Sequence, residues 1–200
     1  MASGAGSSSR EQIVRAALAC AIEQGWESTS LQAVRLRAGV SNGSLFHYFP
    51  SREALAGAVI AAGLSDHQSA LTAELCAVTD ARAGIERVVI RHVQWMQNHR
   101  ALAQLFLSTP PDVLRSGLDA AAVAGNRSFF QDVASWLRDQ GWSGAPELAV
   151  VLALWIGPAQ EYARSHLAAG SGRLDAAADA LAAGAWRAVQ PFLDNPTEDR

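Results

Sequence analysis

The sequence predicts an all-α protein, and three observations support this prediction. Apolar residues recur at steps of three and four along most of the chain, which is the spacing of one face of an α-helix. Capping residues and glycines stand where these patterns begin and end. Half of the 200 residues are hydrophobic and only 18% are charged, so the chain can bury a sizeable core. We expect about nine helices, arranged as a small N-terminal domain and a larger antiparallel helical domain.

The chain begins with a tail and a first helix. Residues 1–8 are small and rich in Gly and Ser, so we expect them to be disordered. Ser9 and Gln12 have the spacing of a capping box and predict the start of a helix, which Gly25 would end. The buried face of this helix is expected to contain Ile13, Ala16, Ala17 and Cys20.

Two short helices joined by a glycine turn should follow. Thr29 and Gln32 again have capping-box spacing, so the first of the two should begin at Thr29. Gly39 can take the left-handed conformation that ends a helix and turns the chain. Ser41 can cap the second helix, over residues 42–49. Such a pair is a helix-turn-helix, whose second helix enters the major groove of DNA.

The run AGVSNGSLFHYFPSREAL, with the helix before it, resembles the DNA-binding domain of the TetR family of bacterial transcription regulators. The resemblance covers about the first 65 residues, and the remainder matches only in helical layout and length. It implies that residues 9–53 form a DNA-binding domain, with residues 42–49 as its recognition helix. It also implies that residues 54–195 form a ligand-binding and dimerisation domain.

The resemblance further implies which residues contact DNA. Those after the turn would contact base edges, since asparagine can pair with adenine and an aromatic ring can pack on a thymine methyl group. Hydroxyl and guanidinium groups at helix ends would hold phosphates. The expected DNA-contacting residues are Thr29, Arg35, Ser41, Asn42, Gly43, Ser44, Phe46, His47, Tyr48 and Arg52, whereas Leu45 and Phe49 should be packing residues.

Two positions depart from the family pattern. Phe46 stands where the family usually has tyrosine, so any contact through that hydroxyl group is lost. Arg35 stands where a helix-turn-helix usually has a small residue that faces the partner helix. Because a buried guanidinium without a partner is costly, Arg35 should either contact a phosphate or extend to the surface.

A long helix is expected from Arg52 to about Cys76, with Gly63 as a close packing contact. Its buried side should contain Leu55, Ala58, Val59, Ala62, Ala70 and Ala73. Five further helices are expected over residues 81–98, 101–108, 112–140, 146–169 and 174–194. Asp80 should cap the first of these, and Pro158 should bend the fourth.

Aromatic residues and two histidines on the expected inner faces of the body suggest a ligand site. A histidine on an apolar face is either a core residue with a local hydrogen bond or a polar group that orients a ligand in a pocket. The aromatic residues could be core alone or could line an apolar cavity, which would favour a neutral, hydrophobic compound. The candidate ligand-binding residues are His92, Trp95, Met96, His99, Phe106, Phe129, Phe130, Val133, Trp155 and Tyr162.

The resemblance implies a homodimer in which the last two long helices pair with their symmetry mates. Small residues at every third or fourth position of the last helix would let another helix approach closely. The expected interface residues are Ala159, Ala163, His166, Leu181, Gly184, Ala185, Ala188 and Phe192.

These features predict a sequence-specific transcription regulator, most simply a homodimeric repressor that a small hydrophobic molecule releases from a palindromic operator in double-stranded DNA. An activator or a ligand-independent DNA-binding regulator of the same family is the alternative. An α-helical enzyme is a different class, and the sequence offers it no Gly-rich phosphate loop, metal cluster or nucleophile–base pair. No cofactor is expected. A metal site is not expected either, because His92 and His99 are two turns apart, which is too far for both to bind one ion.

Charge and cysteine usage agree with this interpretation. Five arginines stand against four acidic residues in residues 1–60, and eleven against fifteen in residues 61–200, so only the N-terminal part is weakly basic. Two cysteines do not make a disulfide framework. The chain starts without the pattern of a signal peptide and has no run of 18 apolar residues, so we expect a cytoplasmic protein with no membrane partner.

Overall fold

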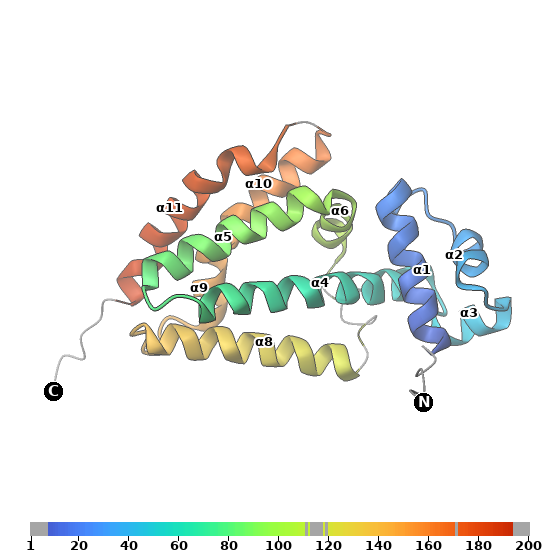
Figure 1. The fold of residues 1–200 in the computed structure, drawn as a ribbon, viewed down its shortest axis with the longest axis horizontal. Helices are drawn as coiled ribbons and strands as arrows, with labels where there is room; N and C mark the ends of the chain where they lie inside the picture. Colours follow the sequence, from blue (N-terminus) through green and yellow to red (C-terminus); the bar gives the residue numbers. More distant parts are fainter. Residues whose placement is uncertain (1–7, 111, 113–117, 119, 171, 194–200) are drawn as a thin grey trace, which may run out of the picture. The chain divides into compact units, whose positions relative to one another are not determined.

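The computed structural model describes residues 8–110, 112, 118, 120–170 and 172–193, and these residues form helices and no β-strand (Figure 1). The prediction of an all-α protein is confirmed. The expected N-terminal tail falls almost entirely outside the described residues, as do most of residues 112–119 and the end of the last expected helix. None of the helices described is both long and apolar enough to cross a membrane.

Compactness divides the chain into two units, and each is described by itself. The first unit contains residues 1–64 and 101–123, and the second contains residues 65–100 and 124–200. The long helix α4 (Arg52–Cys76) starts in the first unit and continues in the second. Its bounds are those expected from the sequence.

The first unit is built from the N-terminal helices α1 (Ser9–Gln24), α2 (Leu31–Ala38) and α3 (Asn42–Tyr48), the start of α4, and most of α6 (Arg100–Ser108). Helix α1 packs against both α2 and α3. The expected buried face of α1 is confirmed, and its apolar residues share a core with the other helices. That core contains Ile13, Ala17, Val34, Leu45, Phe49, Leu55 and Val59.

The capping residues of α1 and α2 each lie one position away from those expected. The Ser8 hydroxyl accepts a hydrogen bond from the Glu11 backbone N–H (3.3 Å), and a Glu11 carboxylate oxygen accepts one from the Ser8 N–H (3.2 Å). This capping box replaces the one expected at Ser9, because a charged Glu also interacts favourably with the helix N-terminus. Helix α2 is capped by Ser30, whose hydroxyl accepts from the Ala33 N–H (3.1 Å).

Gly63 of α4 is a packing contact, as expected. A Cβ atom at this position would collide with the side chain of Leu102 on α6. The absence of a side chain therefore lets these two helices of the first unit approach closely.

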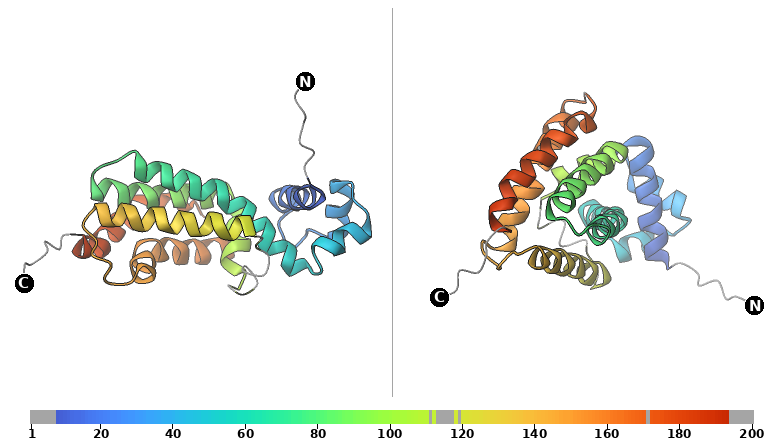
Figure 2. Two further views of the ribbon diagram at one scale, coloured as in Figure 1. Left: turned by 90° about the horizontal axis from the view of Figure 1, so that it is seen from below. Right: turned by 60° about the vertical axis from the view of Figure 1, so that its left-hand side comes forward.

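The second unit contains the rest of α4, α5 (Ala81–Asn98), most of α8 (Ala120–Asp139), α9 (Leu148–Trp155), α10 (Gly157–Ala168) and α11 (Ala178–Val189). Short 3-10 turns flank α11 at Leu174–Ala177 and Gln190–Phe192. Within this unit α4 lies between α5 and α8 (Figures 1 and 2). Helix α11 packs against α5, α9 and α10. Asp80 caps α5 as expected, through a 2.7 Å hydrogen bond from the Ala83 N–H.

The helix expected over residues 146–169 is interrupted, not only bent. Helix α9 ends at Trp155 and α10 begins at Gly157, with Pro158 in its first turn. Proline suits a first turn, where a backbone N–H has no intrahelical partner, but it disrupts a helix interior. The Trp155 indole N–H donates to the Ile85 carbonyl oxygen (3.0 Å), which fixes the end of α9 against α5.

Candidate nucleic-acid interface

The helix-turn-helix predicted from the sequence is present in the first unit. Gly39 ends α2 with φ 66° and ψ 28°, the left-handed conformation that glycine takes without steric cost. The Ser41 hydroxyl then caps α3 by accepting a hydrogen bond from the Ser44 N–H (3.1 Å). The two helices are thus separated by three residues, and α3 ends at Tyr48, one residue before the expected end.

Helix α3 has one buried and one exposed side. Leu45 and the following Phe49 are only 1% and 2% exposed, so the prediction that they are packing residues is confirmed. The opposite side exposes Asn42, Gly43, Phe46, His47 and Tyr48, whereas Ser44 is half-buried. Phe46 and Tyr48 are 44% and 39% exposed although both are large aromatic residues. Both rings remain accessible to solvent, so this side of α3 is available for a partner.

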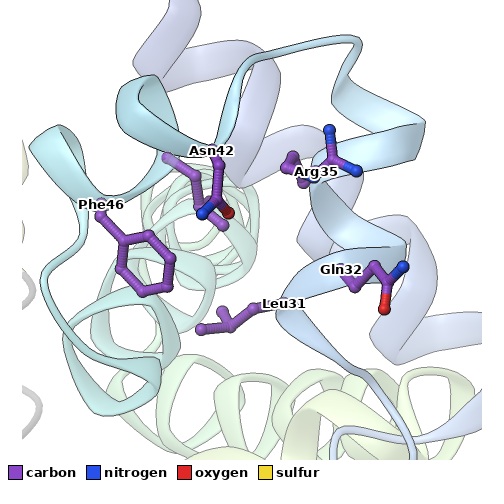
Figure 3. A pocket seen from close by; sticks show the side chains of 6 residues that line it. Leu31, Gln32, Arg35, Asn42 and Phe46 are labelled. Carbon is purple, nitrogen blue, oxygen red and sulfur yellow. The ribbon is translucent and has the colours of Figure 1, made fainter.

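A hollow of about 550 Å³ lies between α2 and α3 (Figure 3). Helix α2 contributes Gln32 and Arg35 to one side, and α3 contributes Asn42 and Phe46 to the other. Its remaining lining residues are Leu31 and Leu45. Amide and guanidinium groups therefore stand beside an exposed aromatic ring, a combination suited to base edges and phosphates.

Arg35 extends into this hollow and is half-buried. It makes no hydrogen bond or ion pair with the residues that the structure describes. Arg37, two residues later, instead forms a bidentate pair with Glu23 of α1 at 2.6 and 2.8 Å. This hydrogen-bonded pair lowers the pKa of the Glu23 carboxyl. The Arg37–Glu23 pair was not predicted, since the two residues are 14 positions apart and no local spacing connects them.

Two residues that were expected to contact phosphates, Thr29 and Arg52, form hydrogen bonds within the protein instead. Thr29 does not cap α2; it is 4% exposed, and its hydroxyl donates to the Gly25 carbonyl oxygen (2.9 Å). Arg52 is half-buried, and its guanidinium donates to the carbonyl oxygens of Trp26 and Glu27. It also lies over the Trp26 ring, 5.0 Å from the centroid. Arg52 therefore ties the start of α4 to the loop before α2, and Thr29 shapes that loop, because neither polar group is left directed outward.

The candidate ligand-binding residues do not all lie inside the body. His92, Trp95, Met96, Val133 and Trp155 are buried in the second unit. Phe129 and Tyr162 are half-buried, Phe130 is 36% exposed, and Phe106 belongs to the first unit. His99 is exposed, contrary to its expected place on the buried face of α5. It follows the last residue of the helix, where its ring stacks on Trp95 at 5.2 Å and its Nδ1 lies 3.0 Å from the Trp95 carbonyl oxygen.

His67 on α4 was not predicted from the sequence as a site residue. This residue is 4% exposed, and its Nε2 lies 2.8 Å from Nδ1 of His92. A signal was present in the sequence, because His67 falls at helical spacing with Ile60, Leu71 and Leu75, all of which are buried. The alanines of α4 obscured it: Ala62 and Ala73 were expected on the buried side but are exposed.

The expected dimer residues also divide into two groups. Ala159, Ala163 and Ala185 are at most 2% exposed within the protomer, so their small side chains serve the packing of α10 and α11 inside one chain. They cannot form the surface that meets a partner. Leu181, Ala188, Phe192 and His166 are half-buried, and Gly184 is exposed. Val150 and Leu154 of α9, which were not predicted, are 45% and 36% exposed.

These features define a helical protein that presents a helix-turn-helix with an exposed second helix. Residues 13–59 match the family model of bacterial regulatory proteins of the tetR family. A search of curated proteins found no significant match. Over residues 13–59 the chain is therefore similar to the bacterial regulatory proteins of the tetR family.

Solved structures share this fold over most of the chain. The transcriptional regulator FadR from Bacillus subtilis, in complex with stearoyl-CoA, matches with a TM-score of 0.64 and 13% identity, covering 87% of this chain and 96% of that one. The fatty acid degradation regulator FadR from Bacillus halodurans matches with a TM-score of 0.64 and 14% identity, covering 92% of this chain and 98% of that one. NalD, the secondary repressor of the MexAB-OprM multidrug efflux pump in Pseudomonas aeruginosa, matches with a TM-score of 0.53 and 19% identity. The match covers 90% of this chain and 94% of that one. At these identities the likeness concerns the fold alone.

Proposed function

We propose that this protein is a sequence-specific transcription regulator, a homodimeric repressor that a small hydrophobic molecule releases from a palindromic operator. The observation that carries the DNA-binding part is the division of α3 into two sides. Leu45 and Phe49 anchor the helix, whereas Asn42, Phe46 and His47 face outward. In this proposal residues 9–53 bind DNA, and residues 54–195 bind the ligand and form the dimer.

The exposed side of α3 would read the major groove. Asn42, in the first turn of α3, would pair with an adenine, and the Phe46 ring would pack on a thymine methyl group. Gly43 has no side chain to keep the helix backbone away from the DNA. His47 and Tyr48 would complete the contact through their polar atoms, with the Tyr48 hydroxyl on a phosphate.

Arg35 would bind a phosphate at the edge of the hollow between α2 and α3. Its guanidinium has no partner among the described residues, and Arg35 lines the same hollow as Asn42 and Phe46 (Figure 3). Half-burial beside an apolar wall strengthens an interaction with an anion, because less water screens it. Arg52 and Thr29 would position the DNA-binding helices, and Ser41 would cap α3.

The homodimer would form through the exposed apolar residues of α9 and α11. Val150 and Leu154 on α9 are large apolar residues that the protomer leaves uncovered, and Leu181, Gly184 and Ala188 lie along the outer side of α11. A two-fold dimer would place two α3 helices on half-sites about 34–36 Å apart.

Ligand release would follow from linkage. A molecule that binds better to the conformation unable to hold DNA must weaken DNA binding to the same extent, typically by about 1–3 kcal/mol. Support comes from the fold relatives, since the FadR structure from Bacillus subtilis contains stearoyl-CoA and NalD is named a repressor. Helix α4 connects the two units and would transmit the change.

A binding selection with fragments of the source genome, followed by mobility-shift assays at defined salt, tests the proposal. Wild-type protein should enrich a nearly palindromic sequence. The Asn42→Ala variant should lose preference at one base pair per half-site, worth about 1–3 kcal/mol of discrimination. Asn98→Ala, at the exposed end of α5, is the matched control and should bind as the wild type does. Failure to enrich any sequence would contradict the function, and an equal loss for all sequences would contradict the role of Asn42.

A further inference from the structure

Two histidines contact each other inside the second unit. His67 on α4 and His92 on α5 are each 4% exposed. The 2.8 Å separation of His67 Nε2 and His92 Nδ1 is a hydrogen bond, and the ring centroids lie 5.0 Å apart. We call this pair the His67–His92 dyad.

The dyad always leaves two polar atoms without a partner. The outer nitrogens, His67 Nδ1 and His92 Nε2, are buried and make no hydrogen bond with the part of the chain that the structure describes. If His67 Nε2 donates to His92, then His92 keeps an N–H on Nε2 and His67 keeps a lone pair on Nδ1. If the tautomers are reversed, the two roles are exchanged. In both cases the dyad offers one donor and one acceptor.

A purely structural role does not explain this arrangement. Each buried polar atom without a partner costs stability, and an apolar residue of similar size would avoid that cost. Leu71, one turn after His67 on the same side of α4, is such a buried aliphatic residue. The two outer nitrogens therefore have hydrogen-bonding capacity that the described residues do not satisfy.

Geometry and charge restrict what that partner can be. A metal ion does not fit between the facing nitrogens, because two ligands of one zinc ion at about 2.0–2.1 Å stand farther apart than 2.8 Å in a tetrahedral site. Groups of three or more metal-ligating side chains are absent from the described residues. Burial lowers the pKa of His67 to about 3 and that of His92 to about 4, so both rings are neutral near pH 7. The dyad thus offers no positive charge to an anion.

The surroundings of the dyad are aromatic and apolar. The Trp95 ring stacks on His67 with centroids 4.5 Å apart, and Met96 beside it is fully buried. On the neighbouring position of α4, the Gln68 amide donates to Asn126 of α8 (2.8 Å). Arg91 on α5 is exposed to solvent, and its positive charge also contributes to the lowered pKa of His67.

We propose that the His67–His92 dyad is the polar end of the effector site and selects a neutral molecule that carries a hydroxyl group on an apolar body. A hydroxyl group both donates and accepts, so it can satisfy either tautomer of the dyad, which a carboxylate cannot. This inference rests on the proposed function, because it names the chemical class of the releasing ligand.

Direct binding to the full chain tests the proposal without DNA. The probes are two matched pairs, 1-octanol with octanoate and 4-propylphenol with 4-propylbenzoate, measured at pH 7.5 by calorimetry and tryptophan fluorescence. Wild-type protein should bind each hydroxyl compound at least about tenfold more tightly than its carboxylate, a difference of about 1.4 kcal/mol. His67→Phe and His92→Leu should each lose that affinity by about tenfold or more. Gln94→Ala is the matched control on α5 and should bind within about threefold of the wild type, because Gln94 is exposed and lies outside the proposed site.

Thermal unfolding separates a binding role from a packing role. The double variant His67→Phe/His92→Leu should keep or raise the melting temperature, because it removes two unpaired polar atoms. A lower melting temperature together with unchanged probe affinity would overturn the proposal. Tighter binding of the carboxylates, or no binding of any probe to the wild type, would also overturn it. Probe binding that leaves operator affinity unchanged would support the dyad and instead contradict ligand-induced release.

Discussion

Arg35 and Arg37 lie two residues apart on α2, yet their surroundings give them different roles. Arg37 forms a bidentate ion pair with Glu23 of α1, so its guanidinium is occupied and holds α2 in place. Arg35 has no such partner among the described residues and lines the hollow beside α3. A charged group without a protein partner at the edge of a concave polar surface is the better candidate for a phosphate contact.

We predict that Arg35→Gln weakens binding to all DNA sequences about equally. Loss of one phosphate contact should reduce the slope of log affinity against log salt by about 1 for each protomer. The comparison is Arg37→Gln, which should leave that slope nearly unchanged, because Arg37 is paired with Glu23. A titration of operator binding at several salt concentrations measures both slopes. Equal slopes for wild type and Arg35→Gln would show that Arg35 extends into solvent without touching DNA.

The His67–His92 dyad also predicts a pH dependence of stability. The pKa of His67 is lowered to about 3 and that of His92 to about 4, whereas both are near 6.5 in the unfolded chain. The unfolded state therefore binds more protons below pH 6.5, and the free energy of unfolding must fall as the pH falls from 6.5 toward 4. The slope should reach at most about 1.4 kcal/mol per pH unit for each histidine.

Denaturant unfolding between pH 7.5 and 5 measures this slope while most carboxyl groups remain ionised. The double variant His67→Phe/His92→Leu should give a flatter curve over the same range. An equally steep curve for the variant would assign the pH dependence to other groups.

Two glycines of the helix-turn-helix, Gly39 and Gly43, have different backbone conformations. Gly39 has φ 66° and ends α2, whereas Gly43 lies inside α3, where the backbone is helical. A Cβ atom at Gly39 meets no other atom, so only the backbone conformation resists a substitution there. At Gly43 a Cβ atom would be 3.9 Å from the Ser41 hydroxyl oxygen, an ordinary contact.

We predict opposite effects on stability for alanine at these two glycines. Gly39→Ala should lower the free energy of unfolding by about 1–2 kcal/mol, because an L-residue is strained in the left-handed conformation. Gly43→Ala should raise it by roughly 0.5–1 kcal/mol, because alanine favours the helix, but should weaken operator binding by moving the backbone away from the DNA. Chemical denaturation and mobility-shift assays on both variants measure these effects. A Gly43→Ala variant with unchanged operator affinity would contradict the close approach of α3.

The elements that the sequence predicted best are those with clear local signals. Helix α4 and helix α5 have the expected bounds, because a charged or capping residue precedes each and its apolar pattern is continuous. The cap of α2 was misplaced by one residue, since Thr29 and Ser30 are both good caps. A tertiary hydrogen bond from Thr29 to Gly25 decides between them, and spacing along the chain does not reveal it.

The candidate sites were harder to predict than the helices. Leu45 and Phe49 were correctly assigned to packing, because they are four residues apart and so lie on the same side of the helix after the turn. The side of α4 that contains His67 was missed, because alanine occurs on both the buried and the exposed sides of this helix. Small residues on α10 and α11 likewise serve contacts inside one protomer as well as between protomers, so Ala159 and Ala185 could not be distinguished from Gly184 by composition.

Dimer formation must use the surface that the folded protomer leaves uncovered. Gly184 on α11 is exposed and has open space where a Cβ atom would be, so a larger residue there does not disturb the protomer. Gly125 on α8 has the same two properties. The pair therefore allows one substitution to be compared on two helices, of which only α11 belongs to the proposed interface.

We predict that Gly184→Arg gives a folded monomer that binds the operator weakly, whereas Gly125→Arg remains a dimer with wild-type operator affinity. An arginine on the outer side of α11 would place two like charges and two long side chains where the symmetry-related helices must approach closely. Light scattering coupled to size-exclusion chromatography gives the mass of each variant, and circular dichroism shows whether its helices are intact. Loss of the dimer should lower operator affinity, because each half-site is then held by a single α3. If Gly184→Arg is still a dimer, the two protomers meet elsewhere, and the exposed Val150 and Leu154 of α9 become the positions to alter next.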